Sequence, residues 1–288
     1  MRYSDFHLHT NYCDGRDDIE SIIREAIKKD MKMLGFSGHS YIDFDDCCMT
    51  PEGQVEYCKT IEQMKQKYHG DIHHDAGLNH TANPMGAHKD ENHHNALKIF
   101  CGVELDYYSE ISTEPFDYVI GSVHFCKTPD GYACVDNTAA IFMENVEKYF
   151  NGNCFDFAEA YYENIKDVKR KTGCDIVGHF DLITKFNEGG VLFDESAPRY
   201  RDMAIAALDE LIAQDALFEV NTGALSRKYK TTPYPSEFLL KRILEKNGRV
   251  ILSSDAHAKE NLCYKFPEMM AYLESLGFTA ANFGCPVH

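Results

Sequence analysis

The sequence contains no uninterrupted apolar run as long as a membrane-spanning helix requires. Its first residues also lack the basic stretch and the apolar stretch of a secretory leader, because residues 3–8 already have the composition of a strand. The first absence excludes a membrane-spanning helix, and the second argues against export. We therefore expect a soluble, cytoplasmic protein that has no membrane partner.

Cysteine pairs of the form C-x-x-C are absent, although the chain contains 11 cysteines. The odd number of cysteines and the missing leader argue against a disulfide framework. We interpret the cysteines as reduced thiols, most of them buried.

Positive charge is scarce. Only 29 lysines and arginines stand against 46 aspartates and glutamates, which gives a formal net charge of −17. Because binding to long DNA or RNA depends on clustered basic side chains, we do not expect a long nucleic acid as a partner. A small phosphorylated ligand would also be repelled, unless cations gathered in a pocket reversed the charge locally.

The chain does contain a regular alternation of short β-rich runs and amphipathic segments of helical period. This pattern is typical of βα units around a parallel sheet, and 288 residues with 44% hydrophobic side chains suit one large α/β domain. The predicted strands cover residues 3–8, 33–37, 98–105, 118–123, 175–178, 217–221, 249–253 and 278–283. The predicted helices cover residues 19–29, 53–67, 139–150, 157–171, 201–214, 236–246 and 267–276.

Residues 69–95 interrupt this alternation. The segment is polar, rich in glycine and asparagine, and contains seven histidines. We predict that it is a loop inserted into a single domain that spans residues 1–288. Its histidines could bind metal as a histidine-rich tract, or the segment could be an ordinary solvated loop.

Polar side chains stand at the carboxyl end of each of the first seven predicted strands. His7 and His9 face the same way, because side chains at positions i and i+2 of a strand share a face. Few ionisable residues are expected inside the strands themselves. In chain order the strand ends carry His7, His9, Asp14, His39, Glu104, His124, His179, Asn221, Arg227, Asp255 and His257.

These strand ends predict a metal centre. In a (β/α) barrel the carboxyl ends of the strands open on one face, where such barrels build their active sites. Packing several bare imidazoles and carboxylates together would be unfavourable, and bound metal ions would remove that conflict. Each histidine alone could be an ordinary core or surface residue, but the joint pattern favours one shared site. Imidazole and carboxylate ligands suit zinc, iron or manganese.

Seven short motifs carry a family resemblance: HLHT, GHS, GVELDYY, GSVHF, GHFDLITKF, EVNTGAL and ILSSDAH. Their order and spacing resemble the PHP family, named for polymerase and histidinol phosphatase, over nearly the whole chain outside residues 69–95. The resemblance implies a distorted (β/α)7 TIM-like barrel with a centre of two or three divalent metal ions. It implies one ion held by His7, His9, Glu104 and Asp255, a second by Glu104, His124 and His179, and a third by Asp14, His39 and His257.

Within the family the motifs look most like those of histidinol-phosphate phosphatases, which implies hydrolysis of L-histidinol phosphate in histidine biosynthesis. We expect Glu104, Asp255 and His257 to act in catalysis. Arg227, with Lys185 and Asn221, is expected to bind the small phosphomonoester substrate. The acidic loop at residues 43–46 could favour a cationic substrate or could simply be solvated. Two alternatives remain open: a nucleotide or oligonucleotide phosphoesterase, and a metal-binding module without catalysis.

Overall fold

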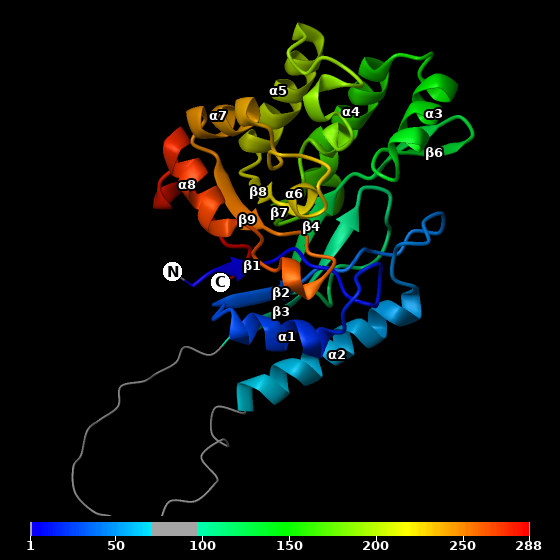
Figure 1. Cartoon of the computed structure of the whole chain (residues 1–288). Helices are drawn as coiled ribbons and strands as arrows, with labels where there is room; N and C mark the ends of the chain where they lie inside the picture. The colour runs from blue at the N-terminus through cyan, green and yellow to red at the C-terminus, as the bar shows by residue number, and fades with distance from the viewer. Residues whose placement is uncertain (1, 71–96, 288) are drawn as a thin grey trace, which may run out of the picture.

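The computed structural model describes residues 2–70 and 97–287, which form a barrel of parallel strands surrounded by helices (Figure 1). Its seven strands lie in the order β1-β2-β3-β4-β7-β8-β9, and every neighbouring pair is parallel. A parallel bridge between Leu8 and Ala256 brings the two edges together beyond the ends of β1 and β9. The predicted fold class is confirmed. The barrel strands are β1 Ser4–Asp5, β2 Met33–Phe36, β3 Lys98–Asp106, β4 Tyr118–Ser122, β7 Ile176–Val177, β8 Leu217–Asn221 and β9 Arg249–Ser253.

Helices follow the strands and cover the outside of the barrel. Figure 1 shows α1 and α2 beside β2 and β3, with α4, α5, α7 and α8 around the other side. Their buried faces are apolar, as in α1, where Ile19, Ile22 and Ile23 pack inward and Asp18 caps the first turn. The helices are α1 Ile19–Lys28, α2 Pro51–Gly70, α3 Ala139–Tyr149, α4 Cys154–Thr172, α5 Pro198–Ala213, α6 Gly223–Ser226, α7 Glu237–Glu245 and α8 Phe266–Leu276. Of the described helices, none has the length and apolar composition needed to cross a membrane.

The amino-terminal half of the barrel interior is filled by side chains. Tyr118 lies in this interior, and its hydroxyl donates to the carbonyls of Phe6 and Phe36 at 2.6 and 3.0 Å. A Cβ atom at Gly102 would lie 2.3 Å from the Tyr118 ring, so a glycine is required there. This packed floor leaves only the carboxyl end of the barrel open for chemistry. The interior cluster consists of Phe6, Tyr118, Ile120, Ile176, Leu217 and Ile251.

Regular pairing in β1 stops earlier than predicted. Phe6 packs into the barrel interior, yet His7 also reaches the interior, so the strict inside-outside alternation of a strand is broken between them. Only Ser4–Asp5 therefore pairs as a regular strand, instead of residues 3–8.

Two further features differ from prediction. The predicted strand at residues 278–283 is wrong, because Thr279 and Asn282 form a capping box around the 3-10 turn Ala280–Asn282. The sequence pattern also missed an antiparallel hairpin, β5 Phe125–Thr128 and β6 Gly131–Cys134. The Pro-Asp-Gly turn at residues 129–131 was the signal that could have revealed it.

The predicted insertion lies mostly outside the described residues. Helix α2 runs to Gly70, three residues past its predicted end at Lys67. Residues 71–96 are not described. Metal binding by the histidines of residues 69–95 and the single-domain organisation of residues 1–288 therefore stay predictions.

Candidate metal centre

The predicted metal ligands lie together around the carboxylate of Glu104, which is 1% exposed. Its Oε1 atom lies 2.8 Å from Nε2 of His179 and 3.3 Å from Nε2 of His124. Its Oε2 atom lies 2.9 Å from Nδ1 of His39, which reaches the cluster from the residues after β2. Ser122, at the end of β4, donates a hydrogen bond of 2.7 Å to Oε1. One carboxylate thus links the ends of several neighbouring strands.

The paired histidines after β1 form the deepest part of the cluster. Nε2 of His7 lies 3.3 Å from Oε2 of Glu104, and Nε2 of His9 lies 3.6 Å from the same atom. Asp255, which follows β9, places its Oδ1 atom 3.3 Å from Nε2 of His9 and 3.8 Å from Nε2 of His7. Both imidazoles therefore face the same two carboxylates.

A second group of side chains lies nearer to solvent. Asp14 places Oδ1 3.6 Å from Nε2 of His39 and 3.6 Å from Nδ1 of His9. Its Oδ2 atom lies 3.1 Å from Nε2 of His257, whose ring stacks on that of His9 at 4.0 Å. The structure thus brings all of the predicted ligands into one continuous cluster.

Glu219 belongs to this site, although the sequence pattern did not reveal it. Its Oε1 atom lies 2.6 Å from Nδ1 of His7, and its Oε2 atom accepts from the backbone N–H of His179 at 2.9 Å. The residue lies inside β8 and is fully buried, and it is one of the few ionisable residues inside the predicted strands. A glutamate between Phe218 and Val220 in a buried strand was the available signal, because such a charge is rarely buried without a partner.

Asp106, the last residue of β3, holds His124 in the same way. Its Oδ2 atom accepts from the backbone N–H of His124 at 3.0 Å and lies 3.1 Å from Nδ1 of that ring. A carboxylate on the far nitrogen fixes the orientation of a ligating imidazole. His7 and His124 therefore both present Nε2 to Glu104, because another carboxylate occupies their Nδ1 side.

The carboxylates of the cluster are ionised. Burial acts to raise the pKa of Glu104, but the neighbouring imidazoles, His7 first among them, hold that pKa well below its usual range. Burial acts on Asp255 in the same direction, and Arg227 and His7 hold its pKa well below normal. Both groups are therefore available as anionic ligands.

The histidines divide into two kinds. Burial acts to lower the pKa of His7, but the carboxylates of Glu219 and Glu104 outweigh it and hold the pKa well above the ordinary value. The pKa of His124 is raised similarly, against burial, chiefly by Glu104. Burial and neighbouring imidazoles lower the pKa of His9 to about 3. In the metal-free protein His9 is therefore neutral, while His7 carries a proton at neutral pH.

These residues fit a bound cation. Nε2 of His7, Nε2 of His9 and Oε2 of Glu104 are all buried and make no hydrogen bond of normal geometry, although Nδ1 of His39 lies 2.9 Å from that oxygen. Such atoms are costly unless something satisfies them, and three of them face one another here. Neutral imidazole with carboxylate is a donor set that suits zinc, manganese or iron. The orphaned atoms therefore point to a metal between them.

A cavity of about 220 Å³ opens over the cluster. Arg227 and Lys185 line it, as predicted, and two unpredicted residues, Asp136 and Tyr229, line it with them. Asp136 follows β6, so it belongs to the hairpin that the sequence pattern missed. The cavity therefore places cationic side chains beside the metal-capable cluster. Its lining comprises Asp14, His39, Glu104, His124, Asp136, His179, Leu182, Lys185, Arg227, Tyr229, Asp255 and His257.

Two predicted substrate contacts have different surroundings. Arg227 lies at the cavity wall, where Nη2 donates to Oδ2 of Asp255 at 2.9 Å and Nη1 donates to Nδ1 of His257 at 2.9 Å. Asn221 is fully buried and does not line the cavity. Its amide nitrogen donates to Glu219 at 3.1 Å, and its carbonyl accepts from the backbone N–H of Gly223. The structure thus places Asn221 behind the wall, where it supports Glu219.

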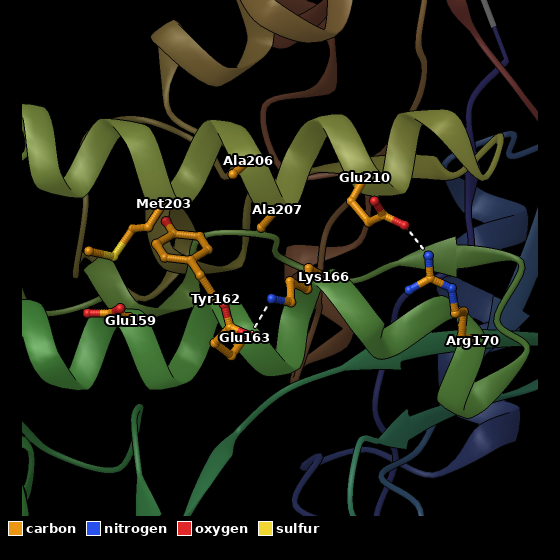
Figure 2. Close-up of a pocket in the computed structure, with 9 residues that line it drawn as sticks. All are labelled: Glu159, Tyr162, Glu163, Lys166, Arg170, Met203, Ala206, Ala207 and Glu210. Carbon is orange, nitrogen blue, oxygen red and sulfur yellow. Dashed lines mark hydrogen bonds and ion pairs between the residues drawn. The ribbon is translucent and has the colours of Figure 1, made fainter.

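A larger cavity, of about 420 Å³, lies between α4 and α5 (Figure 2). Most of its charged side chains pair with one another, Arg170 with Glu210 and Lys166 with Glu163. None of the predicted site residues lines it, and its lining contains glutamates but no histidine, cysteine or aspartate. The chemistry therefore points to the smaller cavity over Glu104.

Comparison with known proteins agrees with this geometry. Histidinol-phosphatase of Bacillus subtilis (strain 168) is 25% identical over 299 residues, covering 95% of this chain and 99% of that protein. A crystal structure of a Listeria monocytogenes protein named for the same activity has a TM-score of 0.72 and 21% identity, covering 92% of this chain and 99% of that one.

Histidinol phosphate phosphatase of Lactococcus lactis, solved with zinc, L-histidinol and phosphate, has a TM-score of 0.65 and 18% identity, covering 96% of this chain and 95% of that one. These two structures share the fold of this chain. The family model described as PHP domain matches residues 5–223, which contain most of the barrel and most of the cluster. The chain therefore belongs to the PHP domain family.

Proposed function

We propose that this chain is a metal-dependent phosphomonoesterase that hydrolyses L-histidinol phosphate to L-histidinol and phosphate. One observation carries the proposal: a cluster of metal-capable side chains with orphaned donor atoms underlies a cavity whose wall holds Arg227 and Lys185. Arg227 and Lys185 offset the repulsion between an acidic protein and phosphate, because they make one cavity attractive to a phosphate dianion. The relatives that span the chain are named for this same activity.

We further propose that two or three divalent cations, of zinc, manganese or iron, occupy the cluster. The expected ligands are His7, His9, Glu104 and Asp255 for one ion, Glu104, His124 and His179 for a second, and Asp14, His39 and His257 for a third. When bound, such ions supply hydroxide at neutral pH and neutralise charge on phosphate oxygens. Glu104 is expected to bridge, because each of its oxygens faces a different set of imidazoles.

The remaining side chains prepare the site and receive the substrate. Glu219 and Asp106 fix the ring orientations of His7 and His124, so these rings do not need to be ordered during the reaction. Arg227 and Lys185 are expected to bind phosphate oxygens, for which guanidinium and ammonium groups are suited. Asp255 and His257 complete the wall on which the phosphate would lie.

Histidinol is the proposed leaving group because its amine is cationic and its imidazole can take up a proton, whereas the protein has a formal net charge of −17. The Lactococcus lactis relative was solved with L-histidinol and phosphate. We propose that the acidic loop at residues 43–46 contributes to this preference.

A substrate panel tests the proposal. Phosphate release should be fastest, by kcat/KM, from L-histidinol phosphate, compared with mononucleotides, short oligonucleotides and simple sugar phosphates. Glu104→Gln should reduce this activity by more than about a hundredfold, because it removes the bridging anion. Glu110→Gln, which changes an exposed glutamate, is the matched control and should leave the activity unchanged. Faster release from a nucleotide, or no release from any phosphomonoester, would refute the proposal.

A further inference from the structure

Lys185 is held in one position at the wall of the catalytic cavity. It follows the 3-10 turn Leu182–Thr184, and its side chain is only 11% exposed. Its ammonium donates to the backbone carbonyl of Asp136 at 2.7 Å and to Oδ2 of Asp136 at 3.0 Å. The rings of Tyr229 and Phe186 lie 5.2 and 5.6 Å from the same nitrogen. An ammonium group has three donors, so two bonds to Asp136 leave one free for a ligand.

Asp136 is the partner that makes this arrangement possible. Among the residues that the structure describes, it is the one carboxylate lining the cavity that lies outside the proposed ligand sets. Burial acts to raise the pKa of Asp136, but Lys185 and then His124 hold it well below the ordinary value. An ionised carboxylate cannot donate a proton to a leaving group, so the lowered pKa argues against Asp136 as the general acid.

A mostly buried ammonium would be unfavourable without a counter-ion. If Asp136 lost its charge, the long side chain of Lys185 could turn out of the cavity toward solvent. A direct role of Asp136 in binding a substrate cation is less favoured, because Lys185 already neutralises it.

We propose that Asp136 is a positioning residue that fixes the ammonium of Lys185 inside the cavity, where Lys185 binds phosphate together with Arg227. The proposal rests on the proposed function, because phosphate is the ligand that the two cations would share. It also assigns a role to the hairpin of β5 and β6, because Asp136 follows β6 and lines the cavity.

Phosphate binding tests the proposal, because two interpretations of Asp136 predict opposite changes in affinity when its charge is removed. If Asp136 acted only as a negative charge near the cavity, Asp136→Asn would strengthen phosphate binding. If it positions Lys185, the same substitution weakens binding. We expect the Kd of inorganic phosphate, measured by titration calorimetry on the metal-loaded protein, to rise about five- to twentyfold. KM for L-histidinol phosphate should rise in parallel, while kcat changes by less than about threefold and metal content stays at the wild-type level.

A second substitution separates positioning from general loss of structure. Lys185→Met should weaken phosphate binding to the same extent, and adding Asp136→Asn to it should cause no further weakening. Asp130→Asn removes the same charge from the exposed turn of the same hairpin and should change nothing. Tighter binding in Asp136→Asn, or further weakening in the double variant, would overturn the proposal.

The two proposals fail separately. If the wild-type protein binds phosphate with the expected dependence on Asp136 but does not hydrolyse L-histidinol phosphate, the positioning role stands and the proposed function fails. If L-histidinol phosphate is hydrolysed but Asp136→Asn does not change phosphate binding, the proposed function stands and the positioning role fails.

Discussion

Glu219 supports two of the proposed metal ligands, although it lies inside a strand and not at a strand end. Its two oxygens bind Nδ1 of His7 and the backbone N–H of His179, so it fixes one proposed ligand directly and another through the main chain. Such outer carboxylates set the tautomer and the orientation of a ligating imidazole. The residue therefore gives a direct test of how the cluster is organised.

We predict that Glu219→Gln lowers the affinity for the divalent ion by about ten- to a hundredfold, because His7 loses its fixed acceptor. Competition with a chromophoric chelator measures this affinity. Glu210→Gln, in the cavity between α4 and α5, makes the same chemical change far from the cluster and should leave the affinity unchanged. An unchanged affinity in Glu219→Gln would show that His7 needs no such support.

Protons should compete with metal for the same imidazoles. The pKa of His7 and that of His124 lie well above the ordinary value, so both rings hold protons at neutral pH in the metal-free protein. A cation must displace these protons, and its apparent affinity should therefore fall as the pH falls. His9, whose pKa is about 3, has no proton to lose at neutral pH.

Titration calorimetry in buffers of different ionisation enthalpy, between about pH 6 and about pH 8, counts the protons released. We expect more than about one proton per metal-loaded site at neutral pH, decreasing as the pH rises. Metal affinity that does not change with pH would contradict the charge distribution described here.

Site residues at the end of a strand could be predicted from the sequence, whereas one inside a strand and one that follows an unpredicted hairpin could not. His39, His124 and His179 follow apolar runs whose carboxyl ends share one face, so a simple barrel argument places them together. Glu219 lies in the middle of such a run, and Asp136 depends on a hairpin that was not predicted. Both support other side chains, and pattern alone does not show which partner a buried charge has.

At the scale of elements, the barrel closes where β1 meets β9. Asp5 is fully buried there, and its Oδ1 atom accepts from the backbone N–H groups of Ser254 and His7 at 3.1 and 3.4 Å. Its Oδ2 atom accepts from the Ser254 hydroxyl at 2.5 Å and from the backbone N–H of Cys263 at 3.0 Å. One carboxylate thus fastens the first strand to the last.

We predict that Asp5→Ala lowers the free energy of unfolding by about 2–4 kcal/mol, because four donors lose a buried acceptor. Urea unfolding of the metal-free protein gives this value without a contribution from bound ions. Glu260→Ala, which removes an exposed ion pair with Arg16, is the control and should cost less than about 1 kcal/mol. Equal stability of Asp5→Ala and wild type would mean that this carboxylate does not hold the barrel closed.

Element prediction succeeded where a segment had a consistent pattern and failed where the pattern was weak or a local cap decided the conformation. Strand β3 and helix α4 have extended, consistent patterns and were found within a few residues. The hairpin of β5 and β6 has strands of four residues each, too short for a clear alternation. The segment at 278–283 has strand-forming residues, but its local cap at Thr279 decides its conformation.

At the scale of the whole molecule, strong negative charge and the proposed phosphate site can coexist because the charges are separated. The chain has a formal net charge of −17, while Arg227 and Lys185 line one small cavity over the cluster. An acidic surface of this kind opposes long nucleic acids and leaves a local site open to a small phosphomonoester. Fold class and family could be predicted from the sequence, because both depend on the order of strands and motifs along the entire chain.

The most direct test of this account is phosphate release from L-histidinol phosphate before metal removal, after chelation, and after return of zinc, manganese or iron in turn. We predict that chelation abolishes at least about 99% of the activity and that at least one of these ions restores it. Full activity in protein that is free of metal, or no hydrolysis with any of the three ions, would contradict the central claim.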